Sequence, residues 1–502
     1  MDSVEPLEHY EPGGLHPILL GDVLDDRFEV NYKLGYGGLA TVWLCYDLRL
    51  KHWKAVKINV AERSTNDCPD LRAIKLMKDH GVDSAILEEK HIALAEETFW
   101  LEGPNGRHLC AVLPVLGPTV YDWRFTLGID ELRVNDICYQ ITEGLAFLHS
   151  KGICHGDFRP DNILMKLRSE SLNQMGREEM RQMLGPPTFA TVLTTDGEHS
   201  PNAPDYVVTG VNMQAFRHLV ADEISIIDFG ESFEISDPPA TLGIPRRYAA
   251  PELIFGGHKP GPGSDMFALA CTIYELRRHT ILDDDLWYLT QNMERIMGPV
   301  PPPYRQTAQQ MIYDHLMKEY EENGDEDEPK PEPPNLNSNT DGMDLEPIVD
   351  SAEGGVSRTE NGDDHYSRPL EKDLATNLTY YPDPLNPNYR DEGTPVEYRL
   401  PHNEVLSLAH FLHQIFRYNP EERMGASKAL KHHWFKRNSP VARRLISIPA
   451  GYALLILILG PLLGWVYLRS ISSTSITQKP SHIQDLFTKL TGVPTVIIYI
   501  VV

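Results

Sequence analysis

The most constraining feature of this chain is a run of polar residues between two apolar segments, Ile-Cys-His-Gly-Asp-Phe-Arg-Pro-Asp-Asn-Ile-Leu at 153–164. Asp157 can orient a hydroxyl nucleophile and accept its proton, and Arg159 can face the terminal phosphate of a nucleotide. Asn162 and Asp228, the latter in Ile-Asp-Phe-Gly at 227–230, can hold Mg²⁺ between phosphates. Together these groups meet the needs of phosphoryl transfer to a hydroxyl.

A glycine-rich segment lies upstream at 34–43, Leu-Gly-Tyr-Gly-Gly-Leu-Ala-Thr-Val-Trp, and predicts a strand, a tight turn and a second strand. Gly35 and Gly37 have no Cβ, so the backbone there can approach phosphates closely. Taken alone, the segment fits an ordinary glycine hairpin equally well. Lys57 follows in a strand-like run, where it can pair with the α- and β-phosphates, or else be a solvated strand lysine.

In this order the motifs resemble those of the protein kinases. Ala-Pro-Glu at 250–252 closes a segment opened by Asp228, and Asn-Pro-Glu-Glu-Arg at 419–423 precedes a Trp-Phe pair. In that family the counterparts of Glu252 and Arg423 form a buried ion pair, and that of Asp265 braces the catalytic loop. The resemblance predicts an α+β, two-lobed protein kinase fold, with a small antiparallel β-sheet lobe and a larger α-helical lobe, which binds ATP and Mg²⁺.

The resemblance also implies roles for individual residues. Asp157 and Arg159 are the expected catalytic residues, and Asn162 and Asp228 the expected Mg²⁺ ligands. The residues expected to contact ATP are Leu34, Gly35, Gly37, Val42, Ala55, Lys57, Leu113, Leu116 and Leu164. We expect His155 to pack against the Asp-Phe-Gly turn rather than act as a base, because Asp157 already fills that role.

Within the kinases, the chain resembles the SR-protein kinases (SRPK), particularly their fungal relatives. Gly-Asp-Val at 21–23, the hinge-like segment 110–117 with Leu113 as gatekeeper, and the apolar run 270–276 resemble that family. In this chain, residues 167–223 separate the catalytic loop from Asp228, and the SR-protein kinase family also carries an insertion at this place. The resemblance implies phosphorylation of serines in arginine/serine-rich proteins.

Several positions depart from the usual kinase pattern. Gly156 replaces an arginine that binds an activation-loop phosphate, which argues against that switch, and SR-protein kinases also lack this arginine. Ala73 aligns with the helix glutamate that should hold Lys57, so Ala73→Glu is expected to improve phosphotransfer, unless Asp70 substitutes through water or the alignment is shifted. Ala249 stands where this group has arginine. The alternative function is therefore a pseudokinase or a membrane-tethered scaffold.

The resemblance implies the lobes of the following organisation, and composition implies the acidic insert and the membrane segment. An N-terminal tail (1–20) precedes the N-lobe (21–116), which should hold a five-stranded sheet and one helix. The C-lobe should comprise 117–316, with the insert 167–223, and 396–436, separated by an acidic insert at 317–395. A membrane helix at 445–468 and a tail at 469–502 should follow. We expect both inserts to be exposed and poorly ordered.

The 502-residue chain has a formal net charge of −26, which argues against direct nucleic-acid binding and favours basic partners. Residues 318–372 carry 17 acidic and 5 basic side chains, together with many Pro, Asn and Gly. This composition predicts disorder, as a solvated linker or as a docking surface for basic peptides. The six cysteines form no Cys-x-x-Cys pair, which is typical of reduced thiols in a cytosolic domain. We expect a monomer.

Residues 445–468 contain no charged side chain, and 24 helical residues at 1.5 Å each can cross a bilayer core of about 30 Å. Four basic residues, Lys436, Arg437, Arg443 and Arg444, precede the segment, whereas only Arg469 follows closely. The positive-inside bias then predicts a membrane anchor with a cytoplasmic kinase domain. Two alternatives are a buried helix and translated non-coding sequence, and the latter would place the protein in cytoplasm and nucleus.

Overall fold

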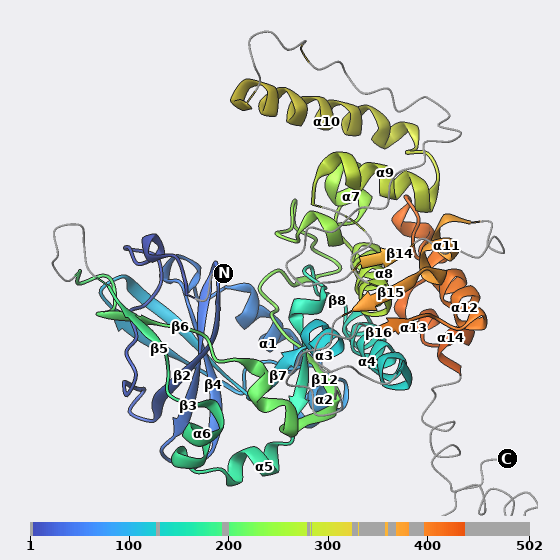
Figure 1. Ribbon diagram of the computed structural model, residues 1–502. Helices are drawn as coiled ribbons and strands as arrows, with labels where there is room; N and C mark the ends of the chain where they lie inside the picture. Colours follow the sequence, from blue (N-terminus) through green and yellow to red (C-terminus); the bar gives the residue numbers. More distant parts are fainter. Residues whose placement is uncertain are drawn as a thin grey trace, which may run out of the picture. The chain divides into compact units, whose positions relative to one another are not determined.

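The computed structural model of the chain (Figure 1) describes residues 4–126, 131–192, 200–278, 282, 284–323, 330, 357–359, 368–380 and 396–436. Residues 1–438 form one compact unit. The second unit, 439–502, lies outside the described residues, and so does the predicted membrane segment 445–468. Among the residues that the structure does describe, no helix is long and apolar enough to cross a membrane.

The N-lobe is built on an antiparallel sheet with strand order β1-β2-β3-β4-β6-β5. Its strands are β1 (Val23–Leu24), β2 (Phe28–Gly37), β3 (Ala40–Asp47), β4 (Trp53–Asn59), β5 (Glu97–Gly103) and β6 (Gly106–Leu113). The five predicted strands are present, and the two-residue β1 adds a sixth. Buried residues such as Trp43, Val56 and Val112 form the core of this sheet.

Two helices accompany the sheet, rather than the single predicted one. α1 (Pro69–Asp79) begins with proline at a position where the missing N–H costs nothing. α2 (Ser84–Glu89) is capped by the side chain of Asp83, which accepts a hydrogen bond from the Ile86 backbone N–H. Short 3₁₀ helices, η1 (Leu7–His9) and η2 (Ala61–Arg63), complete this part of the chain.

The C-lobe is mainly helical (Figure 1). Its helices are α3 (Val120–Thr126), α4 (Glu131–Ser150), α7 (Pro251–Ile254), α8 (Pro262–Arg278), α9 (Leu286–Met297), α10 (Pro302–Asn323), α11 (Pro369–Ala375), α12 (His402–His413), α13 (Ala426–Ala429) and α14 (His433–Lys436). Every residue of α8 from Ser264 to Arg278 is buried, as expected for a helix at the centre of a core. Three 3₁₀ helices, η3 (Pro160–Asn162), η5 (Arg246–Tyr248) and η6 (Pro420–Glu422), lie between them.

Two small antiparallel sheets of the C-lobe position the polar loops. β7 (Leu116–Thr119), β9 (Ile163–Leu167) and β12 (Val220–Ile226) form one sheet with β9 in the middle. β8 (Ile153–Cys154) pairs with β13 (Phe233–Glu234) in the other. The catalytic-loop residues 155–162 therefore lie between a strand of each sheet.

The first insert is not the poorly ordered segment that the sequence predicted. It forms α5 (Ser169–Gln174), α6 (Arg177–Leu184), β10 (Phe189–Thr191), β11 (Tyr206–Val208) and η4 (Met213–Leu219). Leu172, Met180 and Phe216 are buried together with Tyr32 and Trp53 of the N-lobe. α5 and α6 lie beside the N-lobe strands in Figure 1. Apolar side chains hidden against another element cannot remain an exposed loop, so the prediction is wrong for the described part of this insert.

Hydrogen bonds join this insert to the N-lobe at several points. The Tyr32 hydroxyl donates to the Gly185 carbonyl oxygen at 2.9 Å, and the Trp53 indole N–H donates to that of Met175 at 2.9 Å. Asn105 donates to backbone oxygens of both the N-terminal segment and the insert, at Leu15 and Asn202. The insert leaves the C-lobe at β9, returns at β12, and is fastened to the small lobe between them.

The second insert is also ordered in part. Leu370, Leu374 and Ala375 of α11 are buried in the C-lobe core, and Arg295 of α9 pairs with Asp373 at 2.5 Å. The prediction of disorder is wrong for residues 369–375, because these apolar side chains supply core contacts. Strands β14 (Ser357–Thr359), β15 (Asn377–Tyr380) and β16 (Val396–Tyr398) form a sheet. The acidic run 325–328 lies outside the described residues.

Candidate active site

The loop after β8 gathers three of the predicted site residues. Arg159 Nε donates to both carboxylate oxygens of Asp157, each at 3.2 Å. Asn162 Nδ2 donates to the Asp157 backbone oxygen at 2.8 Å and to its Oδ2 at 2.7 Å. Because the amide nitrogen of Asn162 points at Asp157, its oxygen is the atom that can face a cation. The loop therefore presents a carboxylate, a guanidinium and an amide oxygen together.

Asp265 of α8 holds this loop from below, as predicted. Its carboxylate accepts the backbone N–H of His155 at 2.8 Å and that of Gly156 at 3.0 Å, and it pairs with His149 at 3.0 Å. Burial on its own would raise the pKa of Asp265, but the hydrogen bond and charge of His149 outweigh this effect and lower it. A buried carboxylate with several donors fixes the loop conformation.

His155 packs against the Asp-Phe-Gly turn, as the sequence predicted. Its side chain is fully buried, its ring centroid lies 5.1 Å from that of Phe229, and Nε2 is 2.9 Å from the backbone oxygen of Ile227. These contacts give His155 a structural role in holding the Asp-Phe-Gly turn. They also connect the catalytic loop directly to the segment that carries Asp228.

Strand pairing explains why Asn162 and Asp228 converge. Ile163 of β9 lies opposite Ile226 of β12, and the Ile227 backbone N–H donates to the backbone carbonyl oxygen of Asn162 at 2.9 Å. Asp228 has a positive φ of 61°, a left-handed conformation that is uncommon outside glycine but that aspartate adopts more readily than most residues. An amide oxygen and a carboxylate are ligands of the kind that Mg²⁺ prefers, so these two residues fit the predicted ion.

Lys57 of β4 meets two carboxylates. Its Nζ lies 3.1 Å from Asp228 Oδ1 and 3.6 Å from Asp70 Oδ1, the latter in the first turn of α1. Burial opposes the charged form of Lys57, but the two carboxylates outweigh burial and raise its pKa. Lys57 in turn lowers the pKa of Asp228, although burial acts in the opposite direction. The ammonium and the carboxylate therefore both stay charged at neutral pH.

The alignment of helix α1 needs a correction. Ala73, which aligned with the usual glutamate, is buried in the core beside Met77 and takes no part in the ion pair. Asp70, one turn earlier, is the partner of Lys57 and reaches it at ion-pair distance rather than through water. The sequence offered Asp70 only as a substitute, because spacing alone cannot tell which turn of a helix faces a strand.

The expected nucleotide-contacting residues lie largely on one face of the N-lobe sheet. Val42 lies opposite Lys57, Ala55 lies opposite Leu113, and Ala55 and Lys57 are two residues apart on β4. Directly paired residues and those two apart point to the same face of a sheet. The register therefore gives Val42, Ala55, Lys57 and Leu113 a common face.

The remaining expected contacts come from the glycine hairpin and the β7-β9 sheet. Leu34 is half-buried at an irregularity in the β2-β3 register, next to Gly35. A Cβ placed on Gly35 or Gly37 would meet no atom within 4 Å, so the space beside them is open to a phosphate. Leu116 and Leu164 are both half-buried on neighbouring strands, opposite Lys166 and Thr119.

The end of the segment opened by Asp228 is anchored as predicted. Arg423 Nη2 lies 2.6 Å from Glu252 Oε2, and both side chains are fully buried. The Tyr248 hydroxyl, next to Ala249, donates to Glu275 of α8 at 2.6 Å. These buried charged contacts fix the segment that follows Asp228 to the C-lobe core.

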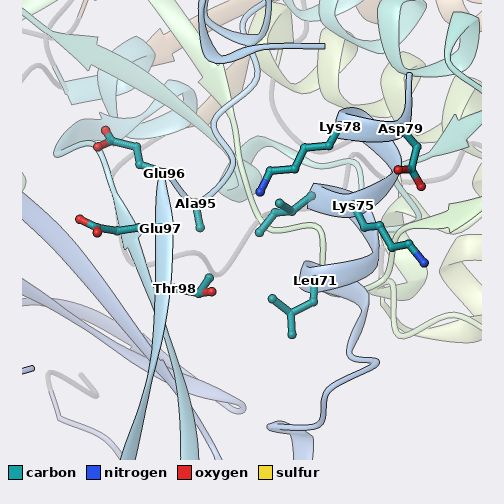
Figure 2. A pocket seen from close by; sticks show the side chains of 9 residues that line it. Leu71, Lys75, Lys78, Asp79, Ala95, Glu96, Glu97 and Thr98 are labelled. Carbon is teal, nitrogen blue, oxygen red and sulfur yellow. The ribbon is translucent and has the colours of Figure 1, made fainter. Parts of the chain in front are cut away.

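Figure 2 shows a pocket of about 350 Å³ between α1 and β5. Leu71, Lys75 and Lys78 of α1 line one side, and Glu97 and Thr98 line the other. No residue expected to contact ATP lines this pocket. Neither Asp70 nor Lys57 lines it, so the pocket is separate from the candidate active site.

The protein kinase domain family matches residues 28–174 and 216–435. Together with the two lobes and the ordered polar residues, this match shows that the chain belongs to the protein kinase domain family. The stretch between the two matched ranges, 175–215, lies within the first insert. The matched ranges contain every residue predicted for catalysis, Mg²⁺ binding and ATP binding.

Within that family the chain is distantly related to the SRPK kinases. SRSF protein kinase 3 of Homo sapiens is 31% identical over 202 residues, covering 39% of this chain and 35% of that protein. Protein kinase dsk1 of Schizosaccharomyces pombe is 32% identical over 181 residues, or 34% of this chain and 32% of dsk1. A serine/threonine-protein kinase SRPK of Physarum polycephalum is 27% identical over 299 residues, or 55% and 66%. The chain spans about a third of the length of the first two relatives.

Proposed function

We propose that the chain is an ATP-dependent serine/threonine protein kinase that phosphorylates serines of arginine/serine-rich proteins. One observation carries the proposal: Lys57, Asp228, Asn162 and Asp157 lie close together, connected by an ion pair, strand pairing and hydrogen bonds. A pseudokinase would have no need of all four groups in this arrangement.

Each group has a distinct proposed role. Asp157 orients the substrate hydroxyl and accepts its proton, and Arg159 faces the transferred phosphate. Lys57 pairs with the α- and β-phosphates, while Asn162 and Asp228 would hold Mg²⁺, which neutralises the phosphate charge when bound. Arg159 already contacts Asp157, so its guanidinium lies next to the carboxylate that acts as base.

The substrate class rests on relatives and on charge. SRSF protein kinase 3 and protein kinase dsk1 are identical to this chain at about a third of the aligned positions. The chain has a net charge of −26, which favours association with an arginine-rich peptide. Ala249 stands where the SR-protein kinases carry arginine. We expect this difference to change the preference for the residue next to the phosphoacceptor, and to leave the general preference for basic substrates unchanged.

The test is phosphate transfer from ATP to an Arg-Ser repeat peptide by the full-length chain. Asp157→Ala should lower kcat by about 10² to 10⁴-fold, because a positioned base contributes that much, while ATP binding persists. Asp314→Ala, an exposed aspartate on α10, is the matched control and should keep full activity. A Lys-Ser peptide of equal charge should be a poorer substrate if arginine geometry is recognised. Equal transfer by wild type and Asp157→Ala would contradict the enzyme and favour a pseudokinase.

We also propose, from the sequence alone, that residues 445–468 tether the kinase domain to a membrane with the lobes in the cytoplasm. The uncharged length and the basic residues before it support this placement. If these residues are translated non-coding sequence, the kinase belongs in cytoplasm and nucleus instead.

A further inference from the structure

We propose that Glu5 of the N-terminal segment and Val211 of the first insert are positioning residues for the glycine hairpin (34–43), and through it for ATP. This role rests on the proposed function, since it takes the hairpin as the cover of the ATP phosphates. Both residues lie outside the ranges that match the protein kinase domain family, 28–174 and 216–435. The hairpin is then held by two segments that are not part of the matched domain.

The hairpin begins at a β-bulge. In the pairing of β2 with β3, two steps along β2 from Lys33 to Gly35 correspond to one step along β3, so Leu34 is an extra residue. A bulge bends the strand and changes the direction of the side chains next to it. The Lys33 backbone oxygen accepts a hydrogen bond from the Val211 backbone N–H at 2.9 Å. The insert therefore supplies a donor at the point where the pairing of the two strands is irregular.

Apolar packing reinforces this hydrogen bond. Leu34 and Val211 are both partly buried against the apolar cluster that contains Phe216. A Cβ placed on Gly210 would lie 3.5 Å from the Leu34 backbone oxygen, whereas one placed on Gly35 would meet no atom within 4 Å. The insert therefore contacts the first residue of the hairpin and leaves the space beside the glycine open. Since Leu34 is expected to contact ATP, its position affects ATP binding.

The side chain of Lys33 is held by the N-terminal segment. Its ammonium group pairs with the Glu5 carboxylate, and both side chains are buried. The Tyr10 hydroxyl donates to the same carboxylate. Lys33 Nζ also lies 5.2 Å from the ring centroid of Tyr36, within the glycine-rich stretch. A buried ammonium is destabilising without a charged partner, so Glu5 determines where Lys33, and with it the start of the hairpin, is placed.

These contacts should affect ATP binding rather than the transfer step. Asp157 and Arg159, which act on the hydroxyl and the transferred phosphate in the proposed mechanism, lie on the catalytic loop and not on the hairpin. A loosened hairpin must be ordered again when ATP binds, and this ordering lowers affinity. Loss of either anchor should therefore weaken ATP binding and leave the rate at saturating ATP unchanged.

The experiment measures binding of the non-hydrolysable analogue AMP-PNP with Mg²⁺ to the full-length chain, by titration calorimetry. Glu5→Gln leaves the buried ammonium without a charged partner, and Val211→Pro removes the N–H donor. Each should raise the Kd of AMP-PNP about 3- to 10-fold. With the Arg-Ser peptide, the KM for ATP should rise in parallel, while kcat stays within about twofold of the wild type. Glu5→Gln combined with Lys33→Met removes the buried charge and should restore most of the affinity.

Asp47→Asn is the matched control. Asp47 forms a similarly buried ion pair with Arg27 at 2.6 Å, at the end of β2 and β3 that is remote from the hairpin. This variant should be less stable in urea and should keep the AMP-PNP affinity of the wild type. Val211→Ala, which keeps the N–H but removes two methyl groups, replaces Val211→Pro if circular dichroism shows that the latter is unfolded. Its Kd should rise in the same direction.

Unchanged AMP-PNP affinity in Glu5→Gln or in the folded variant of Val211 would overturn the inference, and so would an equal loss in Asp47→Asn. If the wild type binds AMP-PNP but transfers no phosphate, only the proposed function is contradicted, and the binding constants still decide the role of the two anchors. No binding of AMP-PNP by the wild type would overturn both.

Discussion

At the scale of single residues, Gly156 shows why the arginine of other kinases is missing. Its φ is +81°, and a Cβ built on it would lie 2.2 Å from the backbone oxygen of Glu231. Residues other than glycine are strained at this φ, and backbone atoms cannot yield as a side-chain tip can. The sequence predicted that a phosphate switch is absent, and the structure adds that this position has no room for a side chain.

Gly156→Ala should therefore lower the free energy of unfolding by about 3 kcal/mol or more, combining backbone strain and overpacking. Gly152→Ala is the matched control: its φ of +76° is similar, but a Cβ there meets no atom within 4 Å. That variant should lose only about 1 kcal/mol. Urea unfolding of both variants gives the comparison. Equal losses would mean that Glu231 moves away at little cost.

At the scale of elements, helix α1 determines how well Lys57 is held. Asp70 is its partner on this helix, and the two side chains are partly buried, at 26% and 17% exposure. Ala73→Glu, which the alignment favoured as an improvement, should instead destabilise the protein, because residue 73 is 3% exposed and a carboxylate there would be desolvated. The one-turn difference between Asp70 and Ala73 reverses the expected effect.

Asp70→Ala should raise the KM for ATP by about 3- to 10-fold, since Lys57 loses one of its two carboxylates and is less well placed for the phosphates. Steady-state phosphotransfer at varied ATP measures the effect. Asp67→Ala is the control, because the Asp67 side chain is 82% exposed and pairs with Arg72 at the surface. An unchanged KM in Asp70→Ala would show that Asp228 alone positions Lys57.

The elements also show what the sequence could and could not predict. Asp157, Asn162 and Asp228 were found because their chemistry requires fixed residue types at the ends of short strands, and local spacing records this. The packing of the first insert was not predicted, because Leu172, Met180 and Phe216 lie in separate short helices. Their partners Tyr32 and Trp53 lie more than 100 residues away in the sequence. No periodic pattern marks such packing.

At the scale of the whole molecule, the proposed membrane segment at 445–468 would determine where the protein is located. A tagged full-length protein should sediment with membranes and resist high salt and alkaline carbonate, whereas a chain ending at Arg437 should stay in the supernatant. Burying one Leu or Ile side chain contributes about 1.5–3 kcal/mol of free energy. The total for a span with more than a dozen apolar residues is therefore larger than the free energy of an electrostatic attachment that salt would screen.

Leu455→Lys with Ile458→Lys is the matched control for this fractionation, because two lysines near the middle of a span cost about 2.5–3.5 kcal/mol each. This variant should lose carbonate-resistant sedimentation while its kinase lobes keep their activity. Protease treatment of sealed vesicles should digest the lobes and protect the residues after Arg469. Release of the wild type by salt alone would contradict the span.

The first insert (167–223) restricts how far the two lobes can move apart. The small lobe is fastened to the large one by the chain between β6 and β7, by the backbone bridge of Ile92 with Ile226, and by the bond from Tyr32 to Gly185. Contacts at several separate points restrict rotation of the small lobe against the large one more than a single hinge would. We therefore expect ADP to leave past the glycine hairpin, where a Cβ built on Gly35 or Gly37 would meet no atom within 4 Å, while the two lobes stay fastened to each other.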